Sequence, residues 1–291
     1  MLNFNKNIHV LILFILLVPT ISISSPWDIK LLTAKYKAAY VVADVEMSKL
    51  LPILEERGLK AIKYEHSKDG HHPVILTFGY MYETFLFVPN TEFSIDWILD
   101  DYFEFIMVIP NVMPKDESLV LKADKGPFNF DPILFPTSIR AKLVGDFFKF
   151  NKVLGEISSD WTTYHVVEKE SAEDILQATF TINDLGDSYE MLKSLELIEP
   201  LFEETIMSFQ DDEIDDSTCS RVQWGFEEAS LRPAKVEVEF LSDQIPGFKK
   251  GEIINVNEVD GTTFGGFFGT IDLELTIPYD CMTWCENDLK L

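Results

Sequence analysis

Short apolar runs recur along the chain and are separated by Gly, Pro and polar residues, a pattern that predicts mainly β-structure. The runs 74–78 and 82–89 predict two strands joined at Gly79, and the runs on either side of the polar segment 168–174 predict a hairpin. The full set of expected strands covers residues 35–42, 59–64, 74–78, 82–89, 97–110, 161–168, 175–182, 235–241, 252–256 and 270–278.

Helical spacing of apolar residues is confined to three segments. Asp44 is placed to cap a short helix over 45–54, and a second helix is expected over 138–148. The segment 187–209 has the strongest helical pattern, with a kink or break at Pro200. Residues 114–132 are expected to form a loop-rich insertion. Many strands with two or three helices indicate a single strand-rich domain of the α+β class.

The N-terminal residues have the pattern of a secretory signal peptide. Lys6 precedes a nine-residue apolar stretch, residues 10–18, and Pro19 and small residues including Ser24 follow. A membrane-spanning helix needs about 20 apolar residues, so this stretch is short for one. We therefore expect a signal peptide over 1–24, a domain over 25–291 and a secreted or periplasmic protein. An uncleaved N-terminal anchor is the alternative.

The charge balance limits the classes of partner. The chain has 49 Asp and Glu residues against 24 Lys and Arg, which makes its formal net charge −25. Nucleic acids and anionic membranes would repel such a surface, so we expect neither as a partner once the signal peptide is removed. A small-molecule ligand or substrate is the expected partner, and assembly into a homo-oligomer is compatible with the composition.

Three cysteines are present, and an exported protein usually pairs its cysteines. A bridge from Cys219 to either Cys281 or Cys285 would tie the acidic segment 211–216 to the C-terminal region and leave one thiol. The Cys281–Cys285 spacing differs from the CxxC of redox and zinc sites.

The sequence offers only weak candidates for a metal or for other catalytic groups. Residues 65–72 contain ligand types suited to a metal, but adjacent histidines in a strand point in opposite directions; the candidates are Glu65, His66, Asp69, His71 and His72. The acidic segment 211–216 lacks the ligand spacing of a calcium loop. Neither a G-x-S-x-G motif nor a phosphate-binding glycine loop occurs. We therefore predict no metal and no cofactor.

The segments FGYMYETFLFVPN (78–90) and GDFFKFNKVLGEI (145–157) resemble, in this order, two segments of the acetoacetate decarboxylase family. The first is similar to the family's Y-x-E segment, and the second is similar to the segment that carries the reactive lysine. Residues 236–280 resemble the family's C-terminal strands, and DVEMSKLLP (44–52) resembles its first short helix.

The resemblance implies a β-barrel of that family with a few peripheral helices, and two catalytic residues. Lys152 falls on the Schiff-base lysine, and Glu83 falls on a glutamate that faces the active site. The implied activity is that of a carbon–carbon lyase, or decarboxylase, acting on a small keto acid. A free lysine has a pKa of about 10.4, and burial or a neighbouring cation lowers it; acetoacetate decarboxylase is itself the established example.

The family pattern is incomplete in this sequence. Asn151 stands where the family has Pro, and Val153 stands where it has a second lysine. The family's first strand carries an arginine, whereas here Lys35 and Lys37 are the nearest cations. Lys149 is a further candidate for the missing positive charge, and the run 74–78 offers no second glutamate. These differences support an alternative reading, a non-catalytic secreted β-barrel that binds a small apolar or keto-acid ligand.

Overall fold

The structure, a computed structural model, describes residues 30–87, 94–95, 99–116, 127–184, 188–203, 205–209, 217–226, 231–276 and 278–281. The helices within these residues are α2 (Met47–Glu56), α4 (Ile139–Phe147) and α5 (Ser188–Phe202). The strands are β1 (Lys30–Glu46), β2 (Leu59–Ala61), β3 (His71–Phe87), β4 (Ser94–Ile95), β5 (Tyr102–Pro114), β6 (Phe128–Pro136), β7 (Gly155–Ser159), β8 (Thr163–Glu168), β9 (Asp174–Ile182), β10 (Thr205–Phe209), β11 (Ser217–Ser220), β12 (Val222–Phe226), β13 (Arg232–Phe240), β14 (Ile253–Val256), β15 (Gly266–Thr276) and β16 (Tyr279–Asp280).

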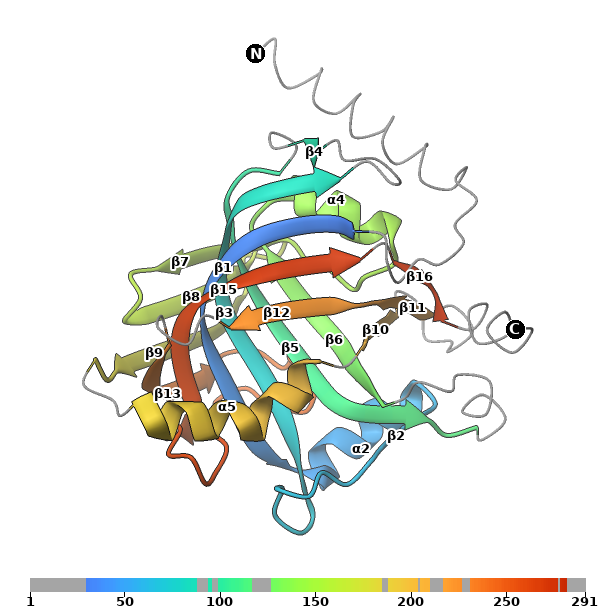
Figure 1. Cartoon of the computed structure of the whole chain (residues 1–291). Helices are drawn as coiled ribbons and strands as arrows, with labels where there is room; N and C mark the ends of the chain where they lie inside the picture. The colour runs from blue at the N-terminus through green and yellow to red at the C-terminus, as the bar shows by residue number, and fades with distance from the viewer. Residues whose placement is uncertain are drawn as a thin grey trace.

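All the strands belong to one strongly curved sheet (Figure 1). Its order is β16-β11-β10-β6-β5-β3-β1-β15-β13-β9-β8-β7, with β12, β14, β2 and β4 paired to the side of this path. The ladders are antiparallel except for β6 with β10. The predicted β-barrel is therefore wrong in one respect: the sheet ends in β16 and β7 and is not closed into a barrel, although β7 comes round to contact β5 and β6.

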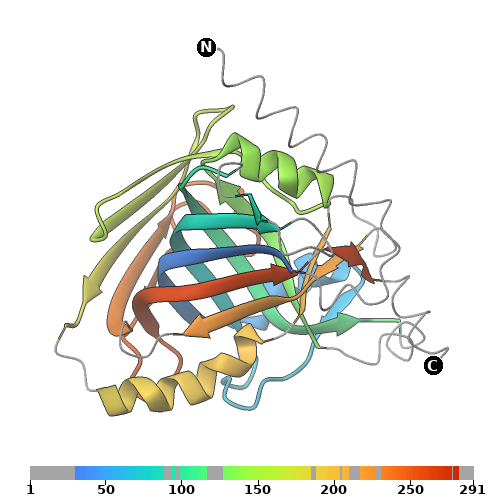
Figure 2. The ribbon, with the colours of Figure 1, turned by 45° about the horizontal axis from the view of Figure 1, so that its top comes forward.

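The sheet separates two apolar clusters because its long strands are buried on both faces. In β5, Phe105 and Met107 belong to one cluster, and Tyr102 and Val108 belong to the other. Helix α2 packs on the first cluster, while α4 and α5 pack on the second. Figure 2 shows α4 and α5 at opposite margins of the curved sheet. Many residues of the second cluster also line a cavity on this face of the sheet.

Three sequence expectations need correction. Gly79 does not divide two strands: β3 runs through it, and a Cβ there would lie 2.1 Å from the Tyr36 ring. The missing side chain thus makes room for a tyrosine. Residues 128–132 belong to β6 rather than to a loop. Helix α5 ends at Phe202 with Pro200 in its last turn, and residues 205–209 form β10 beside β6.

The other expected elements are confirmed with small shifts of their bounds. Helix α4 begins after Ser138, whose hydroxyl accepts a hydrogen bond from the Ala141 amide at 3.3 Å. The helix predicted over 45–54 is α2, although Asp44 belongs to β1 and does not cap it. The predicted hairpin is formed by β8 and β9.

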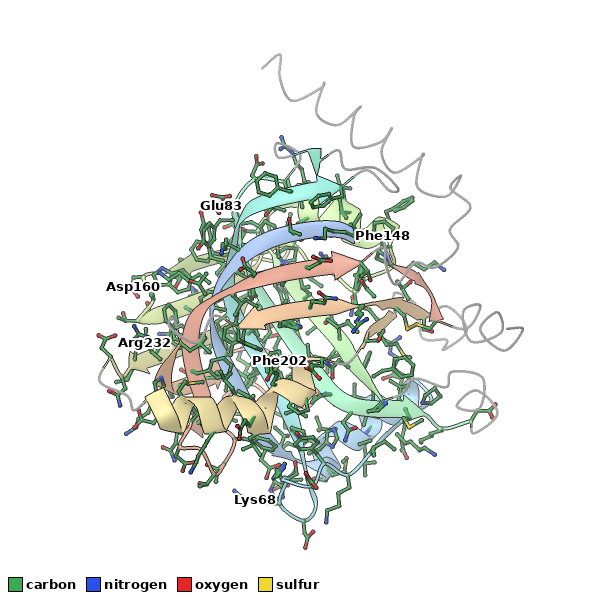
Figure 3. All side chains as sticks on the ribbon, in the orientation of Figure 1. Lys68, Glu83, Phe148, Asp160, Phe202 and Arg232 are labelled. Carbon is green, nitrogen blue, oxygen red and sulfur yellow. A yellow bond between two sulfur atoms is a disulfide. The ribbon has the colours of Figure 1, made fainter. Side chains whose placement is uncertain are left out.

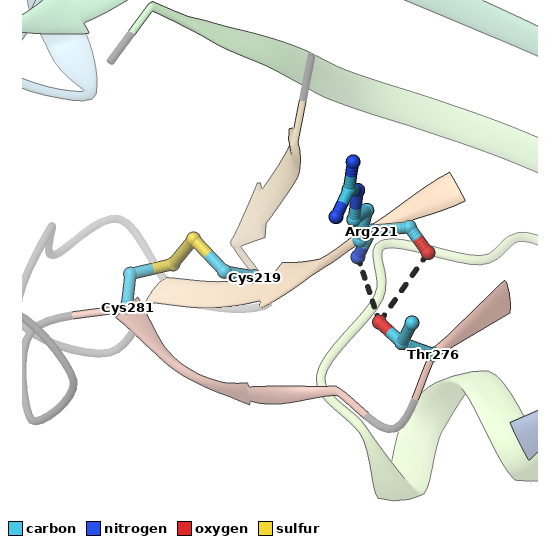
Figure 4. Close-up of a disulfide and its surroundings, with 4 residues drawn as sticks. All are labelled: Cys219, Arg221, Thr276 and Cys281. Carbon is cyan, nitrogen blue, oxygen red and sulfur yellow. Dashed lines mark hydrogen bonds between the residues drawn. A yellow bond between two sulfur atoms is a disulfide. The ribbon is translucent and has the colours of Figure 1, made fainter. Parts of the chain in front are cut away.

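A disulfide joins Cys219 on β11 to Cys281 and so selects one of the two predicted pairings (Figure 4). Nearby, the Arg221 amide donates to the Thr276 hydroxyl at 3.0 Å, which holds the two segments together. Cys285, the acidic segment 211–216 and the predicted signal peptide lie outside the described residues. Among the described helices, none combines the length and the apolar composition needed to cross a bilayer.

Candidate functional site

A cavity of about 100 Å³ lies on the face of the sheet that carries α4. Its wall is mostly apolar, and it contains one lysine, Lys152, and two carboxyl groups, those of Glu104 and Asp131. The remaining lining residues are Leu31, Leu32, Met81, Leu86, Leu99, Tyr102, Ile106, Leu134, Ala141, Val144, Gly145, Phe148, Phe150, Ile206, Val222, Trp224, Leu273 and Leu275. A space of this size suits a ligand of a few heavy atoms.

Lys152 is positioned by a short parallel bridge to β6. The Leu134 amide donates to the Asn151 carbonyl at 3.1 Å, and the Val153 amide donates to the Leu134 carbonyl at 2.9 Å. The Asn151 side chain, at the position of the family's Pro, donates to the Pro132 carbonyl at 2.6 Å. This backbone pairing aims the Lys152 side chain beneath α4 and into the cavity.

Helix α4 covers the Lys152 side chain. Lys152 Nζ donates a long hydrogen bond of 3.4 Å to the carbonyl oxygen of Ala141. A Cβ on Gly145 would lie 2.2 Å from Lys152 Cδ, so the glycine is what allows the lysine stem to pass. Lys152 keeps part of its surface accessible, as expected for a side chain whose amine faces a cavity.

Two buried carboxyl groups face the same space from neighbouring strands. Glu104 alternates with Phe103 and Phe105 along β5 and so projects to the cavity side, where it is 2% exposed. Asp131 on β6 is 3% exposed. The β5–β6 register shifts between the pairs Met107–Ile133 and Ile109–Phe130, and this bulge puts both Asp131 and Leu134 on the cavity face, which strict alternation would forbid.

The electrostatics of the three groups are dominated by removal from water. Burial lowers the pKa of Lys152, and Glu104, Asp131 and Asp146 oppose that shift. Burial raises the pKa of Asp131 to about 7, with Lys152 opposing and Glu104 reinforcing the rise. Burial also raises the pKa of Glu104, countered by Lys152 and by the phenol groups of Tyr36 and Tyr102. Burial therefore lowers the pKa of the amine and raises the pKa of both carboxyls, so the three pKa values lie closer together than they would in water.

The structure does not bring Glu83 and Lys152 together. Glu83 is exposed at a bulge of β3, has a φ of 51°, and lines a separate pocket with Lys35 and Asp272 rather than the cavity. Figure 3 labels Glu83 and the cavity residue Phe148, and the two lie well apart in that view. The carboxyl groups beside Lys152 are Glu104 and Asp131 instead.

The cations proposed to replace the missing arginine also lie elsewhere. Lys35 pairs with Asp272 at 2.7 Å, and Lys37 lies over the Trp161 ring at 4.3 Å from its centre. Lys149 is exposed and does not line the cavity. Within the described lining, Lys152 is the only cationic side chain.

Glu104 and Asp131 were missed by reasoning from the sequence, although both leave a signal there. Each is a single acid within a strongly apolar run, YFEFIMVIP for Glu104 and FNFDPILFP for Asp131. A lone carboxylate in a strand that is buried on both faces is costly unless it has a partner or a function. That cost is the physical reason to look for a site at such positions.

The described residues contain no group of three or more His, Cys, Asp or Glu side chains arranged to hold a metal ion. His71 and His72 begin β3 and do point in different directions. The His71 ring bonds the Asp69 carbonyl at 3.2 Å, whereas His72 is buried and bonds the Pro110 carbonyl at 2.7 Å.

Comparison with known proteins identifies the fold. No family model matches the sequence, and no curated protein matches it. An acetoacetate decarboxylase-like enzyme from Sphingomonas wittichii RW1 superposes with a TM-score of 0.52 at 11% identity, over 87% of this chain and 93% of that one. The enduracididine biosynthesis enzyme MppR in complex with pyruvate gives 0.51 at 10% identity, over 86% and 90%. Acetoacetate decarboxylase from Legionella pneumophila gives 0.50 at 13% identity, over 89% and 91%. The chain therefore has the fold of the acetoacetate decarboxylase-like proteins.

Proposed function

We propose that this protein is an acetoacetate decarboxylase-like carbon–carbon lyase of the Schiff-base type, with Lys152 as its nucleophile. The observation that carries the proposal is the Lys152 amine in an apolar cavity, flanked by the buried carboxyls of Glu104 and Asp131. The fold neighbours support it, since one of them was solved with pyruvate bound. The sequence resemblance adds a small keto acid as the starting candidate for the substrate.

The cavity supplies the conditions that a lysine nucleophile needs. An ordinary lysine is protonated at neutral pH and is then not nucleophilic. Burial lowers the pKa of Lys152 and so increases the fraction of neutral amine. Attack of Nζ on a substrate carbonyl carbon and loss of water give an iminium, into which the electron pair of the breaking carbon–carbon bond can flow.

The two carboxyls have separable roles in this scheme. Glu104 provides a negative charge for the cationic iminium. Asp131, whose pKa is raised to about 7, can both release and accept a proton near neutral pH, which is the property of an effective general acid or base. Proton transfer to the enamine carbon after bond cleavage is the step that needs such a group.

Reductive trapping tests the proposal. Folded protein is incubated with acetoacetate, pyruvate or a small neutral ketone in the presence of cyanoborohydride, and peptides are mapped by mass spectrometry. We expect a stable adduct on Lys152 that is lost in Lys152→Arg. Lys149→Arg is the matched control, because Lys149 is nearby in sequence, exposed and outside the cavity. Folded protein that gains no adduct on Lys152 with any carbonyl compound would overturn the proposal.

A second candidate function is non-catalytic binding of a small apolar or keto-acid ligand. The observation that favours it is that Glu104, Asp131 and Asp146 all stabilise the charged, non-nucleophilic form of Lys152. Ligand-dependent thermal stabilisation without any Lys152 adduct would support binding over catalysis.

We further propose that the protein is exported. The Cys219–Cys281 disulfide supports this, because such bonds persist in oxidising compartments and are rare in the cytosol. Mass spectrometry of the protein purified from its natural source tests it, with a mature N-terminus near residue 25 as the expected result and an intact Met1 as the contrary one.

A further inference from the structure

We infer that the Lys152 cavity selects small uncharged ketones and aldehydes, hydroxylated ones in particular, over carboxylated keto acids. This inference rests on the proposed Schiff-base role of Lys152 and replaces the keto acid, the starting candidate, by an uncharged carbonyl compound. Three observations carry it: the charge inventory of the cavity, the conservation of charge in the covalent step, and an acceptor atom in the wall that has no partner.

The charge inventory comes first. The charged or ionisable side chains of the cavity wall other than the Tyr102 phenol are one cation, Lys152, and two carboxyls, Glu104 and Asp131; Tyr102 and Trp224 add neutral polar groups, and the rest of the wall is apolar. The chain has four arginines, all within the described residues, and none of them lines the cavity. A substrate carboxylate would therefore enter a site that already has at least as many acidic groups as cations, with no second cation to receive it.

Charge conservation in the reaction points the same way. The ammonium form of Lys152 and a neutral carbonyl compound give an iminium and water: the nitrogen–carbon bond forms, and the carbonyl oxygen leaves with two protons from nitrogen. The positive charge is on the same nitrogen before and after the reaction, so Glu104 can balance it in both states. A keto acid would add a negative charge that no group in the described cavity wall neutralises.

The unpartnered acceptor is Asp131 Oδ1. This atom is buried and has no hydrogen-bond partner, although Asp131 lines the cavity. Leaving a buried acceptor unsatisfied is costly, and a donor on the ligand would remove the cost. A hydroxyl group fits this requirement, whereas a carboxylate brings only acceptors and would meet Asp131 with repulsion.

Competitive reductive labelling with a matched pair of probes tests the inference. Hydroxyacetone and pyruvate have three carbons each and the same methyl ketone, but only pyruvate is charged. Labelling of Lys152 is measured at pH 8 with cyanoborohydride and divided by the labelling of Nα-acetyl-lysine, which corrects for intrinsic reactivity. We expect a normalised preference of at least tenfold for hydroxyacetone.

A charge-removing variant provides the second arm. Asp131→Asn should increase pyruvate labelling several-fold relative to hydroxyacetone labelling, because it removes a repulsive charge and introduces an amide donor that can meet the pyruvate carboxylate. Asp174→Asn is the control, since Asp174 is 61% exposed and pairs with His165 outside the cavity.

The outcomes separate this inference from the proposed function. Equal or preferred labelling by pyruvate would overturn the selectivity while leaving Lys152 as the Schiff-base residue. No labelling of Lys152 by either probe would overturn the proposed function itself, and the inference with it. Because the two probes are compared on the wild-type protein, this test does not depend on the folding of any variant.

Discussion

Replacing Gly145 by Ala tests the packing of Lys152 directly. The added methyl would lie 2.2 Å from Lys152 Cδ, 2.6 Å from Cε and 2.9 Å from Cγ. All three distances are far below van der Waals contact, so the methyl and the lysine stem cannot keep their present positions together. Because Lys152 reaches the cavity only by passing beneath Gly145, the substitution should displace its amine.

The sign of the stability change depends on whether the Lys152 side chain fills the space beneath Gly145. In a helix interior, Ala in place of Gly stabilises by up to about 1 kcal/mol. Overpacking a filled site costs about 1–3 kcal/mol, so Gly145→Ala should destabilise the wild type by roughly 0–2 kcal/mol. With Lys152→Ala the space is vacant, and the same change should become neutral or stabilising. The expected coupling between the two positions is therefore about 1–3 kcal/mol.

Urea unfolding of the wild type, both single variants and the double variant measures this coupling. Reductive labelling of Lys152 in Gly145→Ala supplies a second readout and should fall by about tenfold or more. A coupling below about 0.5 kcal/mol together with unchanged labelling would refute the placement of Lys152 under α4.

Three further predictions concern the carboxyls and the disulfide. Glu104→Gln removes the largest influence that raises the pKa of Lys152, so the pH profile of Lys152 labelling should shift to lower pH. Asp131 is an acid whose folded pKa, about 7, lies above its unfolded value of 3.8, so it binds more protons in the native state. Stability should therefore fall between about pH 4 and 7, by up to about 1.4 kcal/mol per pH unit, and Asp131→Asn should flatten this fall in urea unfolding. Cys281→Ser opens the link to Cys219 across a separation of 62 residues, which should cost about 4 kcal/mol in unfolding free energy without reductant.

Each of these predictions has a control variant and a result that would contradict it. Glu83→Gln should leave the labelling profile unchanged, and an effect equal to that of Glu104→Gln would contradict the assignment of Glu104. The stability of Asp131→Asn should be compared with that of Asp174→Asn, and equal pH slopes would refute the burial of Asp131. Cys285→Ser should not lower stability, whereas a loss matching that of Cys281→Ser would contradict the observed pairing.

The sequence alone determined the class of the fold and most of its elements. Alternating apolar residues located β8 and β9, and the Ser138 cap marked the start of α4, because both signals are local. Segment similarity pointed to Lys152 and to the acetoacetate decarboxylase-like fold that the solved structures show. The local pattern assigned part of β6 to a loop and β10 to a helix. These two strands pair with each other, and the apolar residues of a strand do not reveal which strand it pairs with.

Only the tertiary structure decided which carboxyls accompany the lysine. Glu83 lay in the segment that resembled the family, yet a bulge in β3 leaves it exposed. Glu104 projects to the cavity by regular alternation along β5, whereas Asp131 reaches the same face through the β5–β6 register shift. A single extra residue at a bulge moves the following side chains of a strand to the opposite face of the sheet. Where the bulge lies is set by pairing with strands distant in sequence. Local sequence specified most of the strands and pointed to Lys152, whereas long-range pairing placed the two carboxyls on the same cavity face.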